Sequence, residues 1–528
     1  MYRINQVRLP IGFKEDKLVD YLAEKLKLNK SSLATVELYK LSIDARDKSD
    51  LHYKAGIVFD VIGKFNHTKY KNIDIYEPED LSVDKWKGSS SHIVVVGSGP
   101  SGLFAAIRLI ESGAKVTIVE RGYEMSKRKK AVAELMESGC LDTKSNIQFG
   151  EGGAGTFSDG KLNTGIKSKY IKLVLETFHK NGADKNILYD ARAHIGTDVL
   201  STVIVNMREY FESLGGRVLF ETKFIDFEEK GGVLTGAVLE NNGKVWTEPC
   251  DKVVLAIGHS SRDTIRKLRD RSIVFKKKSF SLGYRIEHLQ ADINTAQYGS
   301  SALAKQLPPA DYHLVEHVGD RVVYSFCMCP GGVVVPAMSE EGTIVTNGMS
   351  YNARDGVNSN SAILVSVGIN DFPSDDELSG IDMQEEIEKK AFNKSNSYKA
   401  TVQTVGDFLS GVPTTKLGKV TPSYRPGFSL GSVEDVLPEF VVSTLKVGIP
   451  KLANKLKCFS DKDAILTAAE TRSSAPYQVV RNLDMETTIS GLFAIGEGAG
   501  FAGGIVSSAV EGLKCADIII KNHNNCFE

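Results

Sequence analysis

The 528-residue sequence has no uninterrupted apolar run of about 18 residues, the length that a membrane-spanning helix needs. Its longest apolar candidates are interrupted by glycine or by charge, for example at Gly97, Arg108 and Glu497. The opening residues, MYRINQVRLPIGFKED, contain neither the apolar stretch nor the small-residue cleavage site of a secretory signal. We therefore expect a soluble, cytoplasmic protein without membrane insertion.

Cysteine is scarce and net charge is nearly absent. The seven cysteines are odd in number and widely spread, which argues against a disulfide framework. Lys and Arg number 65 against 66 Asp and Glu, so no overall field favours binding to nucleic acid. No C-x-x-C pair is present, so a dithiol reductase is disfavoured, and we expect no metal site.

The one close cysteine pair, Cys327 and Cys329, precedes a Pro-Gly-Gly turn. A redox dithiol is one interpretation of this pair. Alternate residues of a strand lie side by side on one face, however, and strain disfavours a disulfide between them. We therefore interpret the pair as two small residues of a strand.

The stretch HIVVVGSGPSGLFAAIRLIESGAKVTIVER, residues 92–121, has the strand, glycine turn, helix and strand pattern of a dinucleotide-binding unit. Its first strand, Ile93 to Val96, is an apolar run typical of a strand buried on both faces. The glycines of the G-x-G-x-x-G motif are Gly97, Gly99 and Gly102. They allow a tight turn, close approach of a pyrophosphate and close helix packing, and Glu120 is placed to bind an adenosine ribose.

Two later segments repeat the pattern of a buried strand followed by a glycine turn. They are DKVVLAIGHSS, residues 251–261, and TTISGLFAIGEGAGFAGG, residues 487–504. The sequence here resembles the two-dinucleotide-binding-domain (glutathione-reductase-type) flavoproteins, with Ala256-Ile257-Gly258 at the sheet-crossing turn and Ile495-Gly496-Glu497 at the C-terminal turn. The resemblance implies FAD, with Glu497 in place of the usual aspartate that binds the ribityl chain.

The loop FGEGGAGTFSDGKLNTG, residues 149–165, contains six glycines and few large apolar side chains. Such a segment cannot form core, so its backbone turns sharply or approaches a ligand. We expect it to cover the pyrophosphate and the flavin. Lys161 and Asp159 are our candidate catalytic residues, because Lys161 beside the flavin would stabilise negative charge on reduction; a solvated lysine on a phosphate loop is the alternative.

Further blocks of the sequence indicate a resemblance to a narrower family. The sequence resembles a bacterial family of uncharacterised FAD-dependent dehydrogenases or oxidoreductases that carry an N-terminal extension. The blocks are NIQFGEGGAGTFSDGKLNTG, DARAHIGTDVL, YSFCMCPGGVVVPA, NGMSYNARDG, ETRSSAP and IGEGAGFAGGIVSSAVEGLKCAD. This resemblance implies FAD and oxidoreductase activity, and it implies no particular substrate.

The fold class we predict is α/β, with a discontinuous Rossmann-type FAD-binding domain, an inserted α+β domain and a small N-terminal α+β domain. Residues 1–88 have a β-α-β-β pattern and form the predicted ferredoxin-like module. The FAD-binding domain comprises residues 89–278 and 480–528. Residues 279–479 form the substrate or cap domain.

The predicted cofactor-binding residues follow the glycine turns and the acids that face them. They are Gly97, Gly99, Pro100, Ser101, Gly102, Glu120, Arg121, Gly152, Gly153, Gly155, Thr156, Gly258, Gly496, Glu497, Gly503, Gly504 and Ile505. His194 and His259 are candidates for flavin contact or proton donation, with a structural histidine as the alternative. Arg285, Arg354 and Arg472 are candidates for an anionic substrate group, or equally for ion pairs with Glu287, Asp355 or Glu470.

These features predict an FAD-dependent oxidoreductase that transfers hydride between flavin N5 and a small organic substrate. The sequence contains no second G-x-G-x-x-G unit, so electrons for a reductase would come from NAD(P)H bound transiently or from an electron-donor protein. An RNA-modifying flavoprotein whose N-terminal module grips tRNA is one alternative, disfavoured by the near-neutral charge. A non-catalytic flavin redox sensor is the other.

Overall fold

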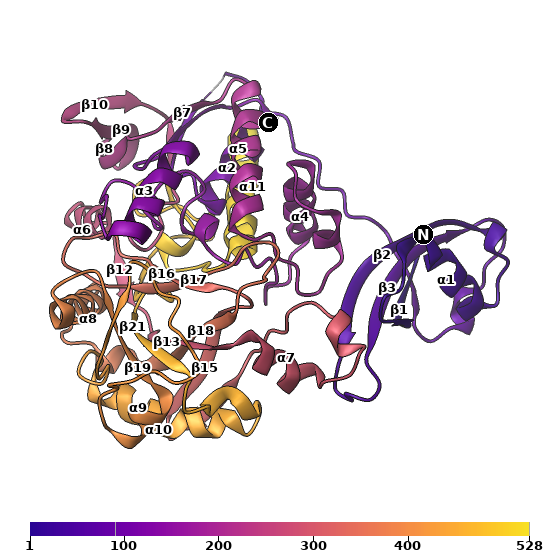
Figure 1. Ribbon diagram of the computed structural model, residues 1–528. Coiled ribbons are helices and arrows are strands. Elements are labelled where there is room, and N and C mark those ends of the chain that lie inside the picture. Colours follow the sequence, from indigo (N-terminus) through magenta and orange to yellow (C-terminus); the bar gives the residue numbers. More distant parts are fainter. Residues whose placement is uncertain (90, 527–528) are drawn as a thin grey trace.

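The computed structural model describes residues 1–89 and 91–526, and Figure 1 shows three regions. The indigo N-terminal module stands to one side of the rest of the chain. Within it, four antiparallel strands have the order β2-β3-β1-β4, as the β-α-β-β pattern predicts. The strands are β1 (Tyr2–Pro10), β2 (Leu33–Asp44), β3 (His52–Val61) and β4 (Ile73–Ile75).

Helix α1 (Leu18–Leu26) covers the module's sheet because Leu18, Leu22 and Leu26 recur on one face and are buried. A short 3-10 helix, His67–Lys69, connects β3 to β4 where a complete ferredoxin-like unit has its second α-helix. The ferredoxin-like assignment therefore stays a prediction. The module contacts the rest of the chain through backbone hydrogen bonds of Leu41 with Tyr189 (2.7 Å) and Ala191 (2.8 Å).

A five-stranded parallel sheet brings together segments that are far apart in the sequence. Its order is β23-β11-β5-β6-β7, and all its pairs are parallel. The strands are β5 (His92–Val96), β6 (Lys115–Val119), β7 (Arg217–Leu219), β11 (Lys252–Leu255) and β23 (Leu492–Ala494). This is the Rossmann-type α/β arrangement that the sequence predicts, with its last strand supplied by the C-terminal segment.

Both faces of this sheet are covered, which is why its strands read as continuous apolar runs. Ile93 and Val95 pack against one cluster of helices, whereas Val94 and Val96 pack against the opposite layer. The helices of the first layer are α2 (Pro100–Ser112), α4 (Tyr170–Lys180), α5 (Thr197–Ser213) and α11 (Ile505–Asn525). The opposite layer contains α6 (Arg262–Asp270) and the antiparallel strands β8 (Lys223–Lys230), β9 (Val233–Asn241) and β10 (Lys244–Pro249). Helix α3 (Met125–Ser138) follows β6.

The third region, orange in Figure 1, is built on a seven-stranded mixed sheet of order β14-β15-β18-β13-β21-β19-β20. Its strands are β13 (Phe280–Leu289), β14 (Val315–Val318), β15 (Arg321–Cys329), β18 (Asn358–Val367), β19 (Ala400–Thr404), β20 (Phe428–Leu430) and β21 (Ile465–Glu470). Two small pairs flank it, β16 (Val333–Pro336) with β17 (Thr346–Met349), and β12 (Phe275–Lys277) with β22 (Tyr477–Val479). Its helices are α7 (Gln290–Tyr298), α8 (Ser379–Ser395), α9 (Val405–Ser410) and α10 (Glu439–Ala453).

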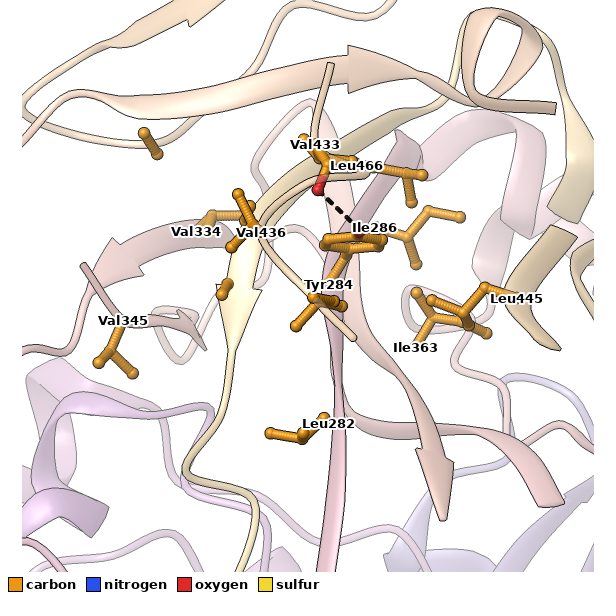
Figure 2. Packing of buried hydrophobic residues seen from close by; sticks show 14 of the residues in the cluster. Leu282, Tyr284, Ile286, Val334, Val345, Ile363, Val433, Val436, Leu445 and Leu466 are labelled. Carbon is orange, nitrogen blue, oxygen red and sulfur yellow. Dashed lines mark hydrogen bonds between the residues drawn. The ribbon is translucent and has the colours of Figure 1, made fainter. Parts of the chain in front are cut away.

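The side chains of β13 divide between the apolar core of this region and the opposite face of the sheet. Leu282, Tyr284 and Ile286 alternate along β13 into the apolar cluster shown in Figure 2, where the Tyr284 hydroxyl donates to the Val433 carbonyl at 2.8 Å. The intervening residues, among them Arg285, point to the opposite face because strand side chains alternate. Across the described residues, none of the helices combines the length and apolar character that a membrane crossing requires.

Candidate cofactor and active site

A cavity of about 830 Å³ opens where the parallel strands end. This volume lies within the range of about 300–1,000 Å³ that small-molecule and cofactor sites occupy. The carboxyl edge of an open parallel sheet is also where such folds bind their ligands. Its walls come from the glycine turn after β5, the loop 149–165, the turns after β11 and β23, and strand β15 of the third region.

The turn after β5 is shaped to admit a pyrophosphate. A side chain on Gly102 would place its Cβ 1.9 Å from the carbonyl oxygen of Gly97, so only glycine lets helix α2 begin this close to the strand. Gly99 is the N-cap of α2, and Pro100 occupies its first turn. The unpaired amides and positive end of α2 therefore face the cavity, where they favour a phosphate group.

The carboxylate of Glu120 holds two of the cavity's walls together. Its Oε2 accepts from the backbone amide (3.0 Å) and hydroxyl (2.7 Å) of Ser98, and its Oε1 accepts from the amides of Gly122 (2.9 Å) and Gly150 (3.0 Å). Glu120 also lines the cavity. Four donors therefore fix the carboxylate of Glu120 at the cavity, and its binding to a ribose stays a prediction.

The predicted residue Arg121 lines the cavity next to Glu120. Its two terminal nitrogens donate to the carboxylate of Asp263 at 3.0 and 3.1 Å, and its guanidinium lies 4.1 Å from the ring centroid of Phe149. A planar cation held flat in this way offers a surface on which an aromatic base can stack.

The loop 149–165 is organised from within by Arg128 of α3, a residue that the sequence analysis did not identify. Its side chain is fully buried and donates to five backbone carbonyls, those of Asn146, Ile147, Gly150, Glu151 and Gly153. Burial lowers the pKa of Arg128 to about 10, and the nearby charges of Glu120 and Glu151 oppose that effect. The guanidinium therefore remains charged at neutral pH. No sequence motif signals this role, because the acceptors are backbone atoms.

The same loop approaches the phosphate turn closely. Gly153 has φ +65°, and a Cβ there would lie 2.9 Å from the Cα of Gly99. Three predicted cofactor residues, Gly102, Gly152 and Thr156, lie behind the lining of the cavity, whereas the other predicted cofactor residues line it. The assignment of these three as cofactor contacts stays a prediction. Gly152 leaves room for the Thr156 hydroxyl, which would lie 2.2 Å from an added Cβ.

Both predicted catalytic residues line the cavity. The Lys161 Nζ donates to the carbonyl of Met328 in β15. Asp159 is 1% exposed and accepts from Arg354 Nε at 3.0 Å, from Arg354 Nη2 and from the Ser350 hydroxyl. Burial opposes ionisation, but the charges of Arg354 and Lys161 lower the pKa of Asp159. This geometry favours Asp159 as a fixed anion that positions Arg354.

Both candidate histidines have partners in the protein. His194 Nε2 lies 3.0 Å from the Asn352 carbonyl, and His259 Nε2 lies 2.9 Å from the Arg472 carbonyl. Burial, with the charge of Arg472, lowers the pKa of His259 to about 4. His259 lines the cavity, so it presents a neutral ring there at neutral pH.

The three arginines pair with carboxylates that are distant in the sequence. Arg285 Nη1 donates to Glu470 Oε1 at 3.1 Å, Arg354 pairs with Asp159, and Arg472 Nη2 donates to Glu388 Oε2 at 2.8 Å. The expected acidic partners were Glu287, Asp355 and Glu470. Of these, only Glu470 forms one of the observed pairs, and its partner is Arg285 rather than Arg472. Glu388 also accepts from Arg262 of α6 at 2.8 and 2.9 Å, so this buried network joins the nucleotide-binding region to the third region.

Two carboxyl groups in the cavity have raised pKa values. Burial raises the pKa of Glu497 to about 8 against the opposing charge of Lys278, and no hydrogen bond to its side chain is found among the described residues. Burial raises the pKa of Glu470 to about 7, with Arg285 opposing. Glu470 is a cavity acid that the sequence analysis treated only as an ion-pair partner.

These features fit FAD. The amide-lined turn suits a pyrophosphate, Glu120 suits a ribose, and the unpaired Glu497 at the C-terminal turn suits the hydroxyl groups of a ribityl chain. Gly504 is the N-cap of α11 and lines the cavity beside Gly503. The positive end of this helix favours negative charge on a bound group.

Comparison with known proteins assigns the chain to a family. Residues 92–134 match the FAD binding domain family, and residues 279–473 match the family described as FAD-dependent protein, C-terminal domain-like. Residues 1–58 match a domain of unknown function, DUF8436. An uncharacterized protein of Clostridium beijerinckii is 44% identical over 528 residues, which is 98% of each chain. The chain belongs to the same family as this clostridial protein.

The two matched FAD families support FAD binding by this chain. The 6-methylpretetramide 4-monooxygenase of Streptomyces rimosus is 28% identical over 182 residues, covering 34% of this chain and 41% of that protein. A geranylgeranyl bacteriochlorophyll reductase-like structure from Thermoplasma acidophilum has a TM-score of 0.36 at 13% identity and covers 83% of each chain. The flavin-dependent brominase Bmp2 has a TM-score of 0.39 at 12% identity, over 82% of this chain and 80% of that one.

Proposed function

We propose that this protein is an FAD-dependent oxidoreductase acting on a small organic substrate. The observation that carries the proposal is one continuous cavity, which joins the three glycine turns of the parallel sheet to side chains of the third region. The glycine turns suit a dinucleotide, and the third region places reactive side chains beside it. Bound FAD would supply hydride transfer at its N5 atom.

The chain's own residues would divide the work along the cavity. Glu120 and Arg121 hold the adenosine end, the turn at Gly97, Gly99 and Gly153 holds the pyrophosphate, and Glu497 holds the ribityl chain. Lys161, whose Nζ donates to the Met328 carbonyl, would stabilise negative charge near the ring of a bound flavin.

Glu470 is the residue best suited to hold or release a proton in this reaction. It lines the cavity, and its pKa of about 7 lets both protonation states be populated at neutral pH. Arg285 and Thr346 fix its two oxygens at 3.1 and 3.2 Å. The carboxyl group is therefore held in one orientation whichever state it adopts.

The source of electrons is part of the proposal. A reductase would take them from NAD(P)H bound transiently, or from an electron-donor protein. A dehydrogenase would take them from the substrate itself.

The test begins with purification and the visible spectrum, which we expect to show one FAD per chain. Anaerobic addition of NADH or NADPH, followed by reoxidation with enones, quinones, 2-keto acids or amino acids, then tests for turnover. Bleaching by substrate alone would identify a dehydrogenase. A colourless protein that does not bind added FAD would overturn the cofactor assignment, and a flavin-loaded protein without turnover on any donor and acceptor would overturn the enzyme assignment.

A further inference from the structure

Strand β15 is distorted where its two cysteines enter the cavity wall. Its pairing with β18 is regular as far as Phe326 opposite Ala362, and then shifts so that Cys329 lies opposite Asn360. Cys327, in the bulge, has φ +44°, a left-handed conformation that is uncommon for a side chain other than glycine. Bulges of this kind re-aim a side chain and are frequent beside active sites. Both cysteines lie in a strand before the Pro-Gly-Gly turn, as predicted, and the bulge is a feature that the sequence did not indicate.

The bulge gives the two thiols different positions. Cys327 is partly exposed and lines the cavity, whereas Cys329 is fully buried behind it. The Cys329 thiol donates to the Cys327 carbonyl at 3.3 Å. Arg285 Nη2 donates to the same carbonyl at 2.6 Å and lies 3.3 Å from Cys329 Sγ, so one buried cation holds both residues.

The charges around Cys327 favour its thiolate. The neighbouring Cys329 lowers the pKa of Cys327, as do the charges of Arg285 on β13 and Lys161 on the loop 149–165, against the effects of burial and of Asp159. Burial, with the hydrogen bond to Cys327, raises the pKa of Cys329. The charge of Cys327 also contributes to the raised pKa of Glu470 on β21. One thiolate and one neutral thiol donor result.

We propose that Cys327 is a nucleophile of the cavity that takes electrophilic ligands of the conjugated-carbonyl class. In the reaction, Cys327 Sγ forms a bond to the β-carbon of the ligand, and the electron pair of its C=C bond moves onto the carbonyl oxygen. A proton from solvent then completes the adduct at the α-carbon, so the step involves no net oxidation. The ligand class rests on the proposed function, because such carbonyls are hydride acceptors. The assignment of Cys327 as a thiolate does not depend on that function.

N-Ethylmaleimide, a conjugated imide, is the probe for this site. The FAD-loaded protein is labelled briefly between pH 5.5 and 8.5, and the modified cysteines are identified by peptide mass spectrometry. We expect Cys327 to be labelled about ten-fold faster than the exposed Cys140 at pH 6.5, because the thiolate is the reactive form. Cys327→Ser should abolish this fast label.

Cys329→Ser and Cys329→Ala test the buried donor. Serine retains a donor and alanine removes it, so the pH at half-maximal labelling of Cys327 should rise more in the alanine variant. Retained flavin absorbance and an unchanged melting temperature identify folded variants. Cys140→Ser is the control and should leave the labelling of Cys327 unchanged.

Labelling of Cys327 no faster than that of Cys140 at any pH below 8 would overturn the proposal, as would fast labelling that persists in Cys327→Ser. The mass measurement does not depend on turnover. Fast labelling without turnover would therefore refute the proposed function alone, and turnover with an unreactive Cys327 would refute this inference alone.

Discussion

The guanidinium of Arg128 donates to the carbonyl oxygen of Glu151 at 2.6 Å, and this contact anchors the loop that covers the cofactor cavity. Four further carbonyls of the segment 146–153 share the same side chain. A loop with so many glycines has few apolar side chains to hold it, and Phe157 and Leu162 are the ones that join the hydrophobic clusters. One buried cation from α3 supplies the order that a hydrophobic core supplies elsewhere.

Arg128→Leu should therefore lower both stability and affinity for FAD. Leaving buried carbonyls without a donor costs about 1–3 kcal/mol each, so we expect the free energy of unfolding to fall by at least about 3 kcal/mol. Urea unfolding and FAD titration measure the two effects. Lys129→Leu, at an exposed position of the same helix, is the control and should change stability by less than about 0.5 kcal/mol. Equal effects of the two substitutions would contradict the role assigned to Arg128.

Gly102→Ala should weaken FAD binding by at least about ten-fold, equivalent to about 1.4 kcal/mol. The added methyl group would lie 1.9 Å from the Gly97 carbonyl, so the phosphate turn must move. Gly368→Ala is the matched control, because a Cβ at that position would lie at an ordinary 3.6 Å from Asp371 Oδ2 and Gly368 does not line the cavity. Isothermal titration of each variant with FAD provides the comparison, and unaltered affinity in Gly102→Ala would show that the turn tolerates a side chain.

Glu388 links Arg262 and Arg472 across the two regions, and its loss should be costly. Burial opposes ionisation, but these two arginines hold the pKa of Glu388 well below its usual range. Its contribution to stability is therefore present above the unfolded pKa, about 4.3, and is lost as pH falls below it. Glu388→Gln should lower the free energy of unfolding by about 3–5 kcal/mol at pH 7, since it leaves buried arginines uncompensated.

The difference between the wild type and Glu388→Gln should shrink as pH falls from about 5 to 3. Urea unfolding at pH 7, 5 and 4 follows this change. Glu386→Gln, on the exposed face of α8 and paired with Lys390, should cost less than about 0.5 kcal/mol. A constant difference across this pH range would mean that the charge of Glu388 is not what the network requires.

Lys161→Met should retain FAD and lose turnover. A preorganised charge beside developing negative charge contributes about 10²–10³-fold in rate, and methionine preserves length without charge. Stopped-flow measurement of flavin bleaching and reoxidation reports the change, and Lys167→Met, at an exposed position two residues after the loop 149–165, is the control. Full activity in Lys161→Met would place the lysine outside the reaction.

The fold and the location of the cavity could be predicted because they depend on local patterns. A strand buried on both faces is apolar at every position, and the turns after β5, β11 and β23 carry glycine where backbones meet closely. These signals placed Gly97, Glu120, Gly258 and Glu497 at one cavity although they are far apart in the sequence. The same motifs also include Gly102, Gly152 and Thr156, which lie behind the cavity lining. A motif gives the spacing of residues along the chain and does not give their distance from the cavity.

The sequence by itself determined a parallel α/β sheet with glycine turns suited to a dinucleotide, since burial and backbone freedom are properties of each segment. Only the tertiary structure decided which charges meet: Arg285 with Glu470, Arg354 with Asp159, Arg472 with Glu388, and Arg128 with bare carbonyls. It also decided that β15 bulges at Cys327, because a strand's register depends on its neighbours. Long-range electrostatic pairing has no sequence period, so it becomes visible only when the segments are brought together.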